Sequence, residues 1–486
     1  MSQQIILAEG PINKVPYDVL SEIFTYCTIK VNPYSNFFDT SRERFQMTPI
    51  ALSHVSSSWR TVAFTTPLLW SHLYYRFTMV KIGNSSIVAE SHERHFLQRD
   101  IDFIRWWKEK HKSLSPVLTF DIKYERLKAT GAGLDLLARN GDLNFILSYL
   151  ATSKYLWIDN LFWDKIRKWI EQGNKVSFPN LHTLIYITNR IEVNHVLPVQ
   201  TLMGLASEPS AAFPLRRLYL HNIRDEMEGS IPVHWSSLTD ICFDFINEID
   251  LHYWNSLVRT LQHLRSAYFN FGGIYWTENI NIPTITCTLS HLETLYVGHY
   301  EELDRDQFSF SLFFANIHLP ALRTLSLSSW APNWSNHRVI NNLHSVLRST
   351  PNITTLILGE EFLALECSDF EERVQLSAIT EPLWRYAPRL MHFRLELRSV
   401  DDEEALEQLD NNIKNIVDFG NIWLDLDNPA CPIRTFTIVS PLHWTADTDF
   451  APSRERTLRA RYPNIEFRLT NESMRFEASK AWETWI

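Results

Sequence analysis

Histidines and carboxylates are the residues of this chain best able to do chemistry, and their spacing argues against catalysis. His92 and His95 flank Glu93, but they lie three residues apart rather than four, the spacing a helical zinc protease needs. The acidic run Asp401-Asp402-Glu403-Glu404 is more simply read as the solvated first turn of a helix, where carboxylates favour the helix dipole. The 18 histidines follow no ligand spacing. We therefore expect no metal site.

Motifs that activate a nucleophile or cradle a phosphate are missing from the sequence. It has no glycine-flanked serine elbow and no Walker or Rossmann glycine pattern. No two of its five cysteines have zinc-knuckle or redox spacing, so we expect buried thiols in a reducing compartment. The cysteines are Cys27, Cys242, Cys287, Cys367 and Cys431. We expect a chain that is not an enzyme and needs no cofactor.

Composition narrows the class of protein further. The chain has 486 residues, 45% of them hydrophobic and 21% charged, as in a soluble globular protein. A formal net charge of -10 argues against a general nucleic-acid binder, which needs a basic surface. No stretch reaches 18 apolar residues, and residues 1–10 do not resemble a secretory signal. We expect no membrane contact and a cytoplasmic or nuclear location.

Three short helices are predicted near the N-terminus. One follows Val15 and begins at Pro16, a residue suited to the first turn. Two more begin at Thr48-Pro49 and Thr66-Pro67, each a cap residue followed by proline. The apolar residues of the first helix recur with helical spacing, and they are Pro16, Val19, Leu20, Ile23, Phe24 and Cys27. From the residues alone, these helices are equally an ordinary cap on the domain that follows.

The same segment resembles an F-box of the type common in fungal proteins. The resemblance rests on Val15–Phe24, on Leu52–Ala63 and on Thr66–Ser71, which occur in the family's order; Thr28–Met47 stands as an insertion. It implies binding to the Skp adaptor and, through it, to a cullin scaffold. The adaptor-binding residues it implies are Pro16, Val19, Leu20, Ile23, Phe24, Leu52, Val55, Trp59 and Trp70.

An apolar phrase recurs along the rest of the chain, with three apolar residues at i, i+3 and i+5. Its first anchors lie 23 to 43 residues apart, and proline often precedes it, as at Pro320 and Pro351. The copies are Leu181/Leu184/Tyr186, Leu215/Leu218/Leu220, Leu238/Ile241/Phe243, Leu264/Ala267/Phe269, Leu292/Leu295/Val297, Leu322/Leu325/Leu327, Ile353/Leu356/Leu358, Leu390/Phe393/Leu395, Ile433/Phe436/Ile438 and the degenerate Ile465/Phe467/Leu469. The phrase resembles a leucine-rich repeat, a strand followed by a helix or turn.

Helical periodicity lies between the phrases, which favours a parallel sheet. The helical intervals are Leu251–Leu264, Val339–Arg348, Arg373–Tyr386 and Ile413–Phe419. The fold prediction is α/β, with a three-helix F-box followed by a curved leucine-rich-repeat-like solenoid with a parallel sheet. The predicted segments are a tail at 1–10, the F-box at 11–75, a connecting helical segment at 76–115, the solenoid at 116–475 and a tail at 476–486. The alternative is an unrelated α/β domain.

Two features sit before the regular phrases. Ile101, Ile104, Trp107 and Lys108 indicate an amphipathic helix within the connecting segment. Val117–Ile122 and Tyr155–Ile158 are predicted as early, atypical repeats that form the N-terminal part of the solenoid.

Residues between the apolar anchors are predicted to face the open, concave side of the sheet, because side chains alternate along a strand. They mix tyrosine and arginine, both enriched at binding hot spots, with acidic groups. The predicted target-binding residues are Arg217, Tyr219, His221, Asp240, Asp244, Tyr268, Asn270, Tyr296, Ser326, Ile357, His392, Arg394 and Glu396. A merely solvated face, or a site on the convex face or loops, is the alternative.

Together these features predict a substrate receptor of a Skp–cullin–F-box ubiquitin ligase. The first segment would bind the adaptor and the repeats would bind an unidentified target protein. Two alternatives stay open: an F-box interaction protein without a ligase role, and an enzyme built on a repeat scaffold from residues distant in sequence.

Overall fold

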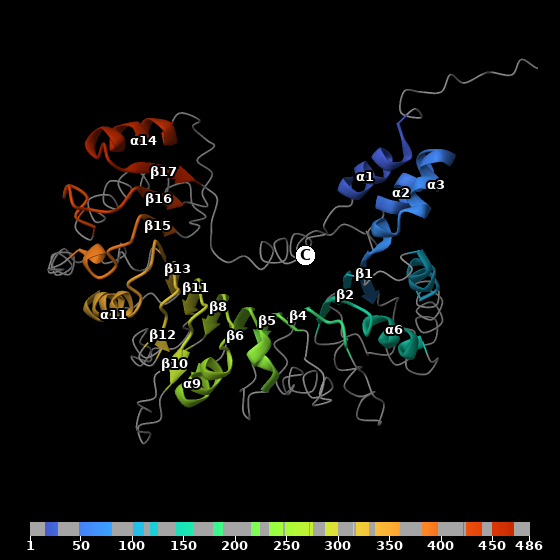
Figure 1. Ribbon diagram of the computed structural model, residues 1–486, viewed down its shortest axis with the longest axis horizontal. Helices are drawn as coiled ribbons and strands as arrows, with labels where there is room; N and C mark the ends of the chain where they lie inside the picture. The colour runs from blue at the N-terminus through green and yellow to red at the C-terminus, as the bar shows by residue number, and fades with distance from the viewer. Residues whose placement is uncertain are drawn as a thin grey trace, which may run out of the picture. The chain divides into compact units, whose positions relative to one another are not determined.

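The computed structural model describes the chain in segments that form two compact units (Figure 1). The first unit holds the described residues up to Leu215, and the second holds those from Arg216 onward. The described segments are 15–27, 48–79, 101–110, 117–124, 142–159, 178–187, 215–223, 233–245, 248–271, 273–275, 287–299, 314, 317–329, 336–359, 382–396, 421, 424–439 and 450–470. Three features discussed above lie outside these segments: the predicted helix at Ile413–Phe419, the histidine pair at His92–His95 and the acidic run at Asp401–Glu404.

Short helices open the first unit, but the helix predicted to begin at Thr48 is broken at Ser56 into two, and the one predicted at Thr66-Pro67 is a 3-10 turn. They are α1 (Tyr17–Cys27), α2 (Thr48–Val55), α3 (Ser57–Thr65) and the 3-10 turn η2 (Pro67–Trp70). Ser56 caps α3, since its hydroxyl accepts a hydrogen bond from the Trp59 amide at 3.1 Å. Side chains join α1 to the end of α3: Tyr17 Oη lies 2.7 Å from Thr65 Oγ1, and Ser21 Oγ lies 2.9 Å from Thr66 Oγ1.

Trp70 links this helical group to the residues that follow it. Its ring is fully buried, and its indole N–H donates to the Ala63 carbonyl at 2.8 Å. The indole N–H of Trp107 donates in turn to the Trp70 carbonyl at 2.6 Å. Trp107 belongs to the helix at 101–110, whose Ile101 and Ile104 are also buried, so the amphipathic helix predicted there is confirmed.

Parallel strands form the rest of the first unit. In sheet order they are β1 (His72–Met79), β2 (Val117–Tyr124), β3 (Tyr155–Asp159) and β4 (Thr183–Ile187), with α6 (Asp142–Leu150) before β3. The segments from Val117 and from Tyr155, which were predicted as early repeats, are therefore strands, and both belong to the first unit. The predicted boundary between residues 75 and 76 falls inside β1, so part of the segment predicted to be helical is a strand.

The strands of the second unit follow one another in the sheet in chain order, all parallel. They are β5 (Arg217–Ile223), β6 (Asp240–Phe245), β8 (Ser266–Phe271), β11 (Thr294–His299), β13 (Thr324–Ser329), β14 (Thr355–Gly359), β15 (His392–Glu396), β16 (Thr435–Val439) and β17 (Glu466–Thr470). The prediction of an α/β chain with a large parallel sheet is confirmed. Two small strand pairs accompany this sheet: β7 (Glu248–Asp250) with β9 (Gly273–Tyr275), and β10 (Cys287–Thr288) with β12 (Ile317–His318).

Helices connect some of these strands. They are α9 (Leu251–Thr260), α11 (Asn336–Ser349), α14 (Phe450–Arg461) and the 3-10 turns η3 (Val233–Ser237) and η5 (Leu383–Arg385). The first two fall where helical periodicity was predicted. Of the predicted helix Arg373–Tyr386, only its end is described, and there the chain forms η5. None of the helices in the described segments is long and apolar enough to cross a membrane.

The recurring apolar phrase builds the core of the second unit. Its middle anchors align in register from β11 to β17, and there each of them is at most 2% exposed. Those so aligned are Leu295, Leu325, Leu356, Phe393, Phe436 and Phe467. Proline sets the turn before several strands: Pro320 and Pro351 occupy the second position of turns closed by the Leu322 and Ile353 amides.

Candidate protein-binding surfaces

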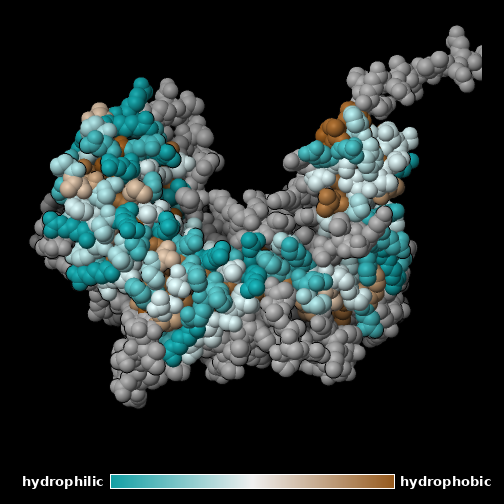
Figure 2. Space-filling view, viewed as in Figure 1, coloured by the Kyte–Doolittle hydropathy of each residue, from teal (hydrophilic) through white to brown (hydrophobic). Residues whose placement is uncertain are grey.

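Large apolar side chains are exposed on the opening helices of the first unit. Tyr17, Val19 and Ile23 are each 45% exposed, Val55 is 59% exposed and Leu68 is 55% exposed. We call these five residues the exposed apolar set; Figure 2 shows hydrophobic surface near α1. Among the described residues, Met391 alone joins them as an exposed large hydrophobic side chain. These exposed apolar side chains make the opening helices the first candidate surface.

The adaptor-binding residues predicted from the sequence divide by burial. Pro16, Val19, Ile23 and Val55 are exposed, whereas Leu52 and Trp59 are half-buried. Leu20, Phe24 and Trp70 are buried in the helical core.

This division corrects the predicted set. The ring of Phe24 packs against that of Trp59, with centroids 4.8 Å apart. Helical periodicity marks an apolar stripe but does not say which flank a neighbouring helix covers. Leu20, Phe24 and Trp70 therefore stabilise the helices, and Tyr17 and Leu68, which the prediction omitted, belong to the exposed set.

A second candidate surface is the sheet face of the second unit. Strand register places Tyr268 beside Tyr296, and their ring centroids lie 6.5 Å apart. Both rings are half-buried. Arg217 and Asp240 are likewise paired in register, and Arg217 Nε lies 3.4 Å from Asp240 Oδ2. The predicted face therefore brings aromatic and charged groups together.

An ion pair lies on the same face. Arg394 Nε donates to Glu396 Oε1 at 3.1 Å, and the two side chains are only 11% and 2% exposed. Burial raises the pKa of Tyr296, and the negative charge of Glu396 raises it further, whereas Arg394 opposes the shift. Tyr296 therefore shares the electrostatic environment of this ion pair.

Several of the predicted face residues are not open to a partner. Tyr219, Ser326, Ile357 and Glu396 are buried, so we correct their assignment as contact residues. Strands in a sheet lie about 4.8 Å apart, so that neighbouring side chains shield one another. The side chains of His221 and Asp244 lie outside the described part of the chain. The remaining predicted residues are half-buried or exposed: Arg217, Asp240, Tyr268, Asn270, Tyr296, His392 and Arg394.

Gly298 is a position on this face that the sequence prediction missed. It pairs in register with Asn270, and a Cβ at Gly298 would stand 2.7 Å from Asn270 Oδ1. Glycine thus leaves the space that the Asn270 side chain occupies. A glycine inside a strand is the signal that could have indicated this close approach.

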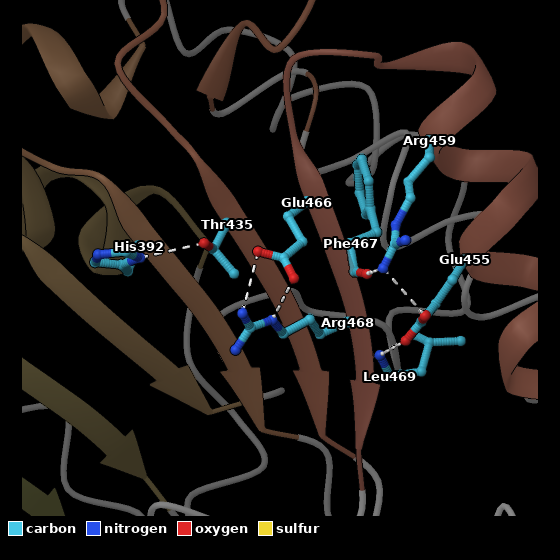
Figure 3. A network of polar contacts seen from close by, with 8 residues as sticks. All are labelled: His392, Thr435, Glu455, Arg459, Glu466, Phe467, Arg468 and Leu469. Carbon is cyan, nitrogen blue, oxygen red and sulfur yellow. Dashed lines mark hydrogen bonds and ion pairs between the residues drawn. The ribbon is translucent and has the colours of Figure 1, made fainter.

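Side chains of α14 form polar contacts with the backbone of β17, the last strand of the second unit (Figure 3). The Leu469 amide in β17 donates to Glu455 Oε1 at 2.9 Å, and Arg459 Nη2 donates to the Phe467 carbonyl at 3.3 Å. Glu455 and Arg459 both belong to α14, and Arg459 Nη2 lies 3.4 Å from Glu455 Oε2. We call these two side chains the α14 clip. A further contact joins the two preceding strands of the sheet. Thr435 Oγ1 in β16 lies 3.3 Å from His392 Nδ1 in β15.

Comparisons with known proteins add no assignment. No protein-family model matches the sequence, and no curated protein matches it. In the part of the chain that the structure describes, no three histidine, cysteine, aspartate or glutamate side chains gather as metal ligands would. The two surfaces above are thus the candidate functional sites.

Proposed function

We propose that this chain is a substrate receptor of a Skp–cullin–F-box ubiquitin ligase. Helices α1–α3 and η2 would form the F-box, and the exposed apolar set would contact the Skp adaptor. The observation that carries the proposal is that Tyr17, Val19, Ile23, Val55 and Leu68 all expose large apolar side chains on these helices. Burying such side chains against a partner stabilises a complex by about 25 cal/mol per Å² of apolar area, before the costs of association.

The second unit would bind the target protein. Its parallel strands follow chain order, which supports a leucine-rich-repeat-like solenoid. Tyr268 and Tyr296 lie side by side on the sheet face of the second unit, and tyrosine is enriched at binding hot spots. A receptor of this kind does no bond chemistry. It raises the effective concentration of the target near the ubiquitin-transferring enzyme.

The adaptor contact is tested by charge on the exposed face of α1. Val19→Asp with Ile23→Asp places two carboxylates in an apolar contact, where they stay unpaired. We expect the double variant to fold normally and to lose Skp adaptor binding in a pull-down of the purified chain. Asp18→Ala is the matched control, since Asp18 is exposed on the same helix but is not apolar. Undiminished adaptor capture by the folded double variant would overturn the proposal.

Target turnover separates a receptor from an F-box protein without a ligase role. Proteins captured by the chain are identified by mass spectrometry, and their half-lives are then compared in cells that hold the intact chain or the double variant. A receptor predicts that at least one captured protein is stabilised by the variant. Unchanged half-lives for every captured protein would leave an interaction protein without ligase function.

A further inference from the structure

Arginines line the N-terminal edge of the strands in the second unit. Arg216, Arg265, Arg323 and Arg434 each lie just before a strand begins, and each is exposed. We call these four residues the arginine row. Figure 2 shows hydrophilic surface over much of this unit.

Backbone hydrogen bonds hold the row in register. The Glu293 amide donates to the Arg265 carbonyl at 2.8 Å, and the Arg323 amide donates to the Glu293 carbonyl at 2.9 Å. The series continues with the Thr354 amide on the Arg323 carbonyl, the Met391 amide on the Thr354 carbonyl and the Arg434 amide on the Met391 carbonyl at 2.7 Å. The Glu466 amide then donates to the Arg434 carbonyl at 2.8 Å. The backbone of this edge therefore presents the arginines at regular intervals.

Among the described residues, the guanidinium groups of the row are not engaged by carboxylates, although Glu293 lies between Arg265 and Arg323. Within the described part of the chain, Arg265, Arg323 and Arg434 form no ion pair, and the Arg216 guanidinium donates to the Ser237 carbonyl rather than to a carboxylate. The arginines on the sheet face of the second unit do have acidic partners, because Arg217 pairs with Asp240 and Arg394 pairs with Glu396. Exposed guanidinium groups are well suited to bind carboxylates from a partner.

We propose that the arginine row binds an extended, acidic segment of a partner protein. Neighbouring strands lie about 4.8 Å apart, so Arg216, Arg265 and Arg323, on alternate strands, lie about 10 Å apart, and Arg434 is about 14 Å further along. An extended peptide rises about 3.3 Å per residue. Acidic residues spaced by three, three and then four positions would therefore meet all four arginines. Met391, which is exposed at the same edge next to Arg434, would accept an apolar side chain just before the last acidic residue.

A protein segment fits this edge better than a nucleic acid does. Glu293 is exposed between Arg265 and Arg323. A nucleic acid carries a phosphate at every nucleotide and would place one against this carboxylate, whereas a peptide can place a neutral residue there. The inference deepens the proposed receptor role, on which it rests, by naming the chemistry of the target segment.

The test uses the purified full chain, without adaptor, and fluorescently labelled probes. The main probe is a peptide of about eleven residues with glutamates in the three-three-four spacing and a leucine before the last one. Its controls are a peptide of the same composition with contiguous glutamates, a glutamine analogue, and a thymidine oligonucleotide of equal charge. We expect the spaced peptide to bind most tightly and to lose affinity as salt is added, because exposed charges are screened.

Matched variants locate the site. Arg323→Glu should weaken the spaced peptide by about tenfold or more, since it turns an attraction into a repulsion, and Glu293→Arg should tighten it. Arg259→Glu, which reverses an exposed charge on α9 outside the row, should leave the affinity unchanged. Equal binding of the spaced and contiguous peptides, tighter binding of the oligonucleotide, or an unaltered affinity in the Arg323→Glu chain would each overturn the inference. Because adaptor capture is measured separately with the α1 variant, failure here and failure of the proposed function are distinguishable.

Discussion

The carboxylate of Glu455 accepts the amide hydrogen of Leu469 at 2.9 Å, although the two residues lie 14 positions apart. Leu469 belongs to β17, the last strand in the sheet order of the second unit. The neighbouring Phe467 carbonyl accepts from Arg459 at 3.3 Å (Figure 3). An edge strand offers such unpaired backbone groups to other chains, so the α14 clip protects the sheet from edge-to-edge pairing.

Removing the α14 clip should destabilise the chain and promote self-association. We expect Glu455→Ala with Arg459→Ala to lower the free energy of unfolding by about 1–2 kcal/mol, because two backbone groups lose charge-assisted hydrogen bonds that are partly open to solvent. Chemical denaturation measures the first effect and analytical ultracentrifugation the second. Thr457→Ala, an exposed change on the same helix, is the control. A double variant that stays monomeric and as stable as the control would contradict the assigned role.

The ion pair between Arg394 and Glu396 should make single truncations costly. Removing Arg394 alone leaves the Glu396 carboxylate, which is 2% exposed, buried without this partner. We expect Arg394→Ala to lower the free energy of unfolding, and Arg394→Ala with Glu396→Ala to cost less than the sum of the single changes. A double-mutant cycle by denaturant unfolding measures this coupling. Additive costs would mean that the pair is not energetically linked.

Because truncating Arg394 should alter stability, it is a poor probe of target binding, and Tyr268→Ala is the better one.

Ionisation of Tyr296 should lower stability at alkaline pH. Its pKa is raised in the folded chain, first by burial and then by Glu396. A raised folded pKa means that the neutral phenol is preferred, so its contribution is fully present below the unfolded pKa of 10.0 and is lost as pH rises above that value. We expect the free energy of unfolding to fall less between neutral pH and pH values above 10.0 in Tyr296→Phe than in the parent chain. Parallel pH curves for the two chains would refute the assignment.

The sequence pattern predicted burial correctly where a residue's position within its own strand decides whether it is buried. Leu325 and Leu327 indicate a buried strand face by spacing alone, and Pro320 indicates the turn before it. Spacing could not distinguish Leu20 from Ile23, because the two lie on one apolar stripe and only the packing of neighbouring helices buries the first. The burial of Glu396 and the bond from Leu469 to Glu455 depend on neighbours distant in sequence, which a single-strand pattern does not reveal.

Gly298 provides the sharpest test of the sheet face, because the sign of its effect depends on Asn270. In a strand without steric conflict, replacing glycine by alanine stabilises a protein by about 0.4–1 kcal/mol, since the unfolded chain loses conformational freedom. At Gly298 the added methyl group would instead stand 2.7 Å from Asn270 Oδ1 and 3.2 Å from its Cγ. The Asn270 side chain must then leave its rotamer, at a cost of about 1–3 kcal/mol.

We therefore expect Gly298→Ala to destabilise the parent chain but to be neutral or stabilising in an Asn270→Ala background. Denaturant unfolding of the two single variants and the double variant measures the reversal. The Asn270→Ala chain is the reference for the double variant, so the asparagine side chain is absent from both chains in that comparison. If Gly298→Ala destabilises both backgrounds equally, the strain comes from the backbone of β11 and not from the Asn270 side chain.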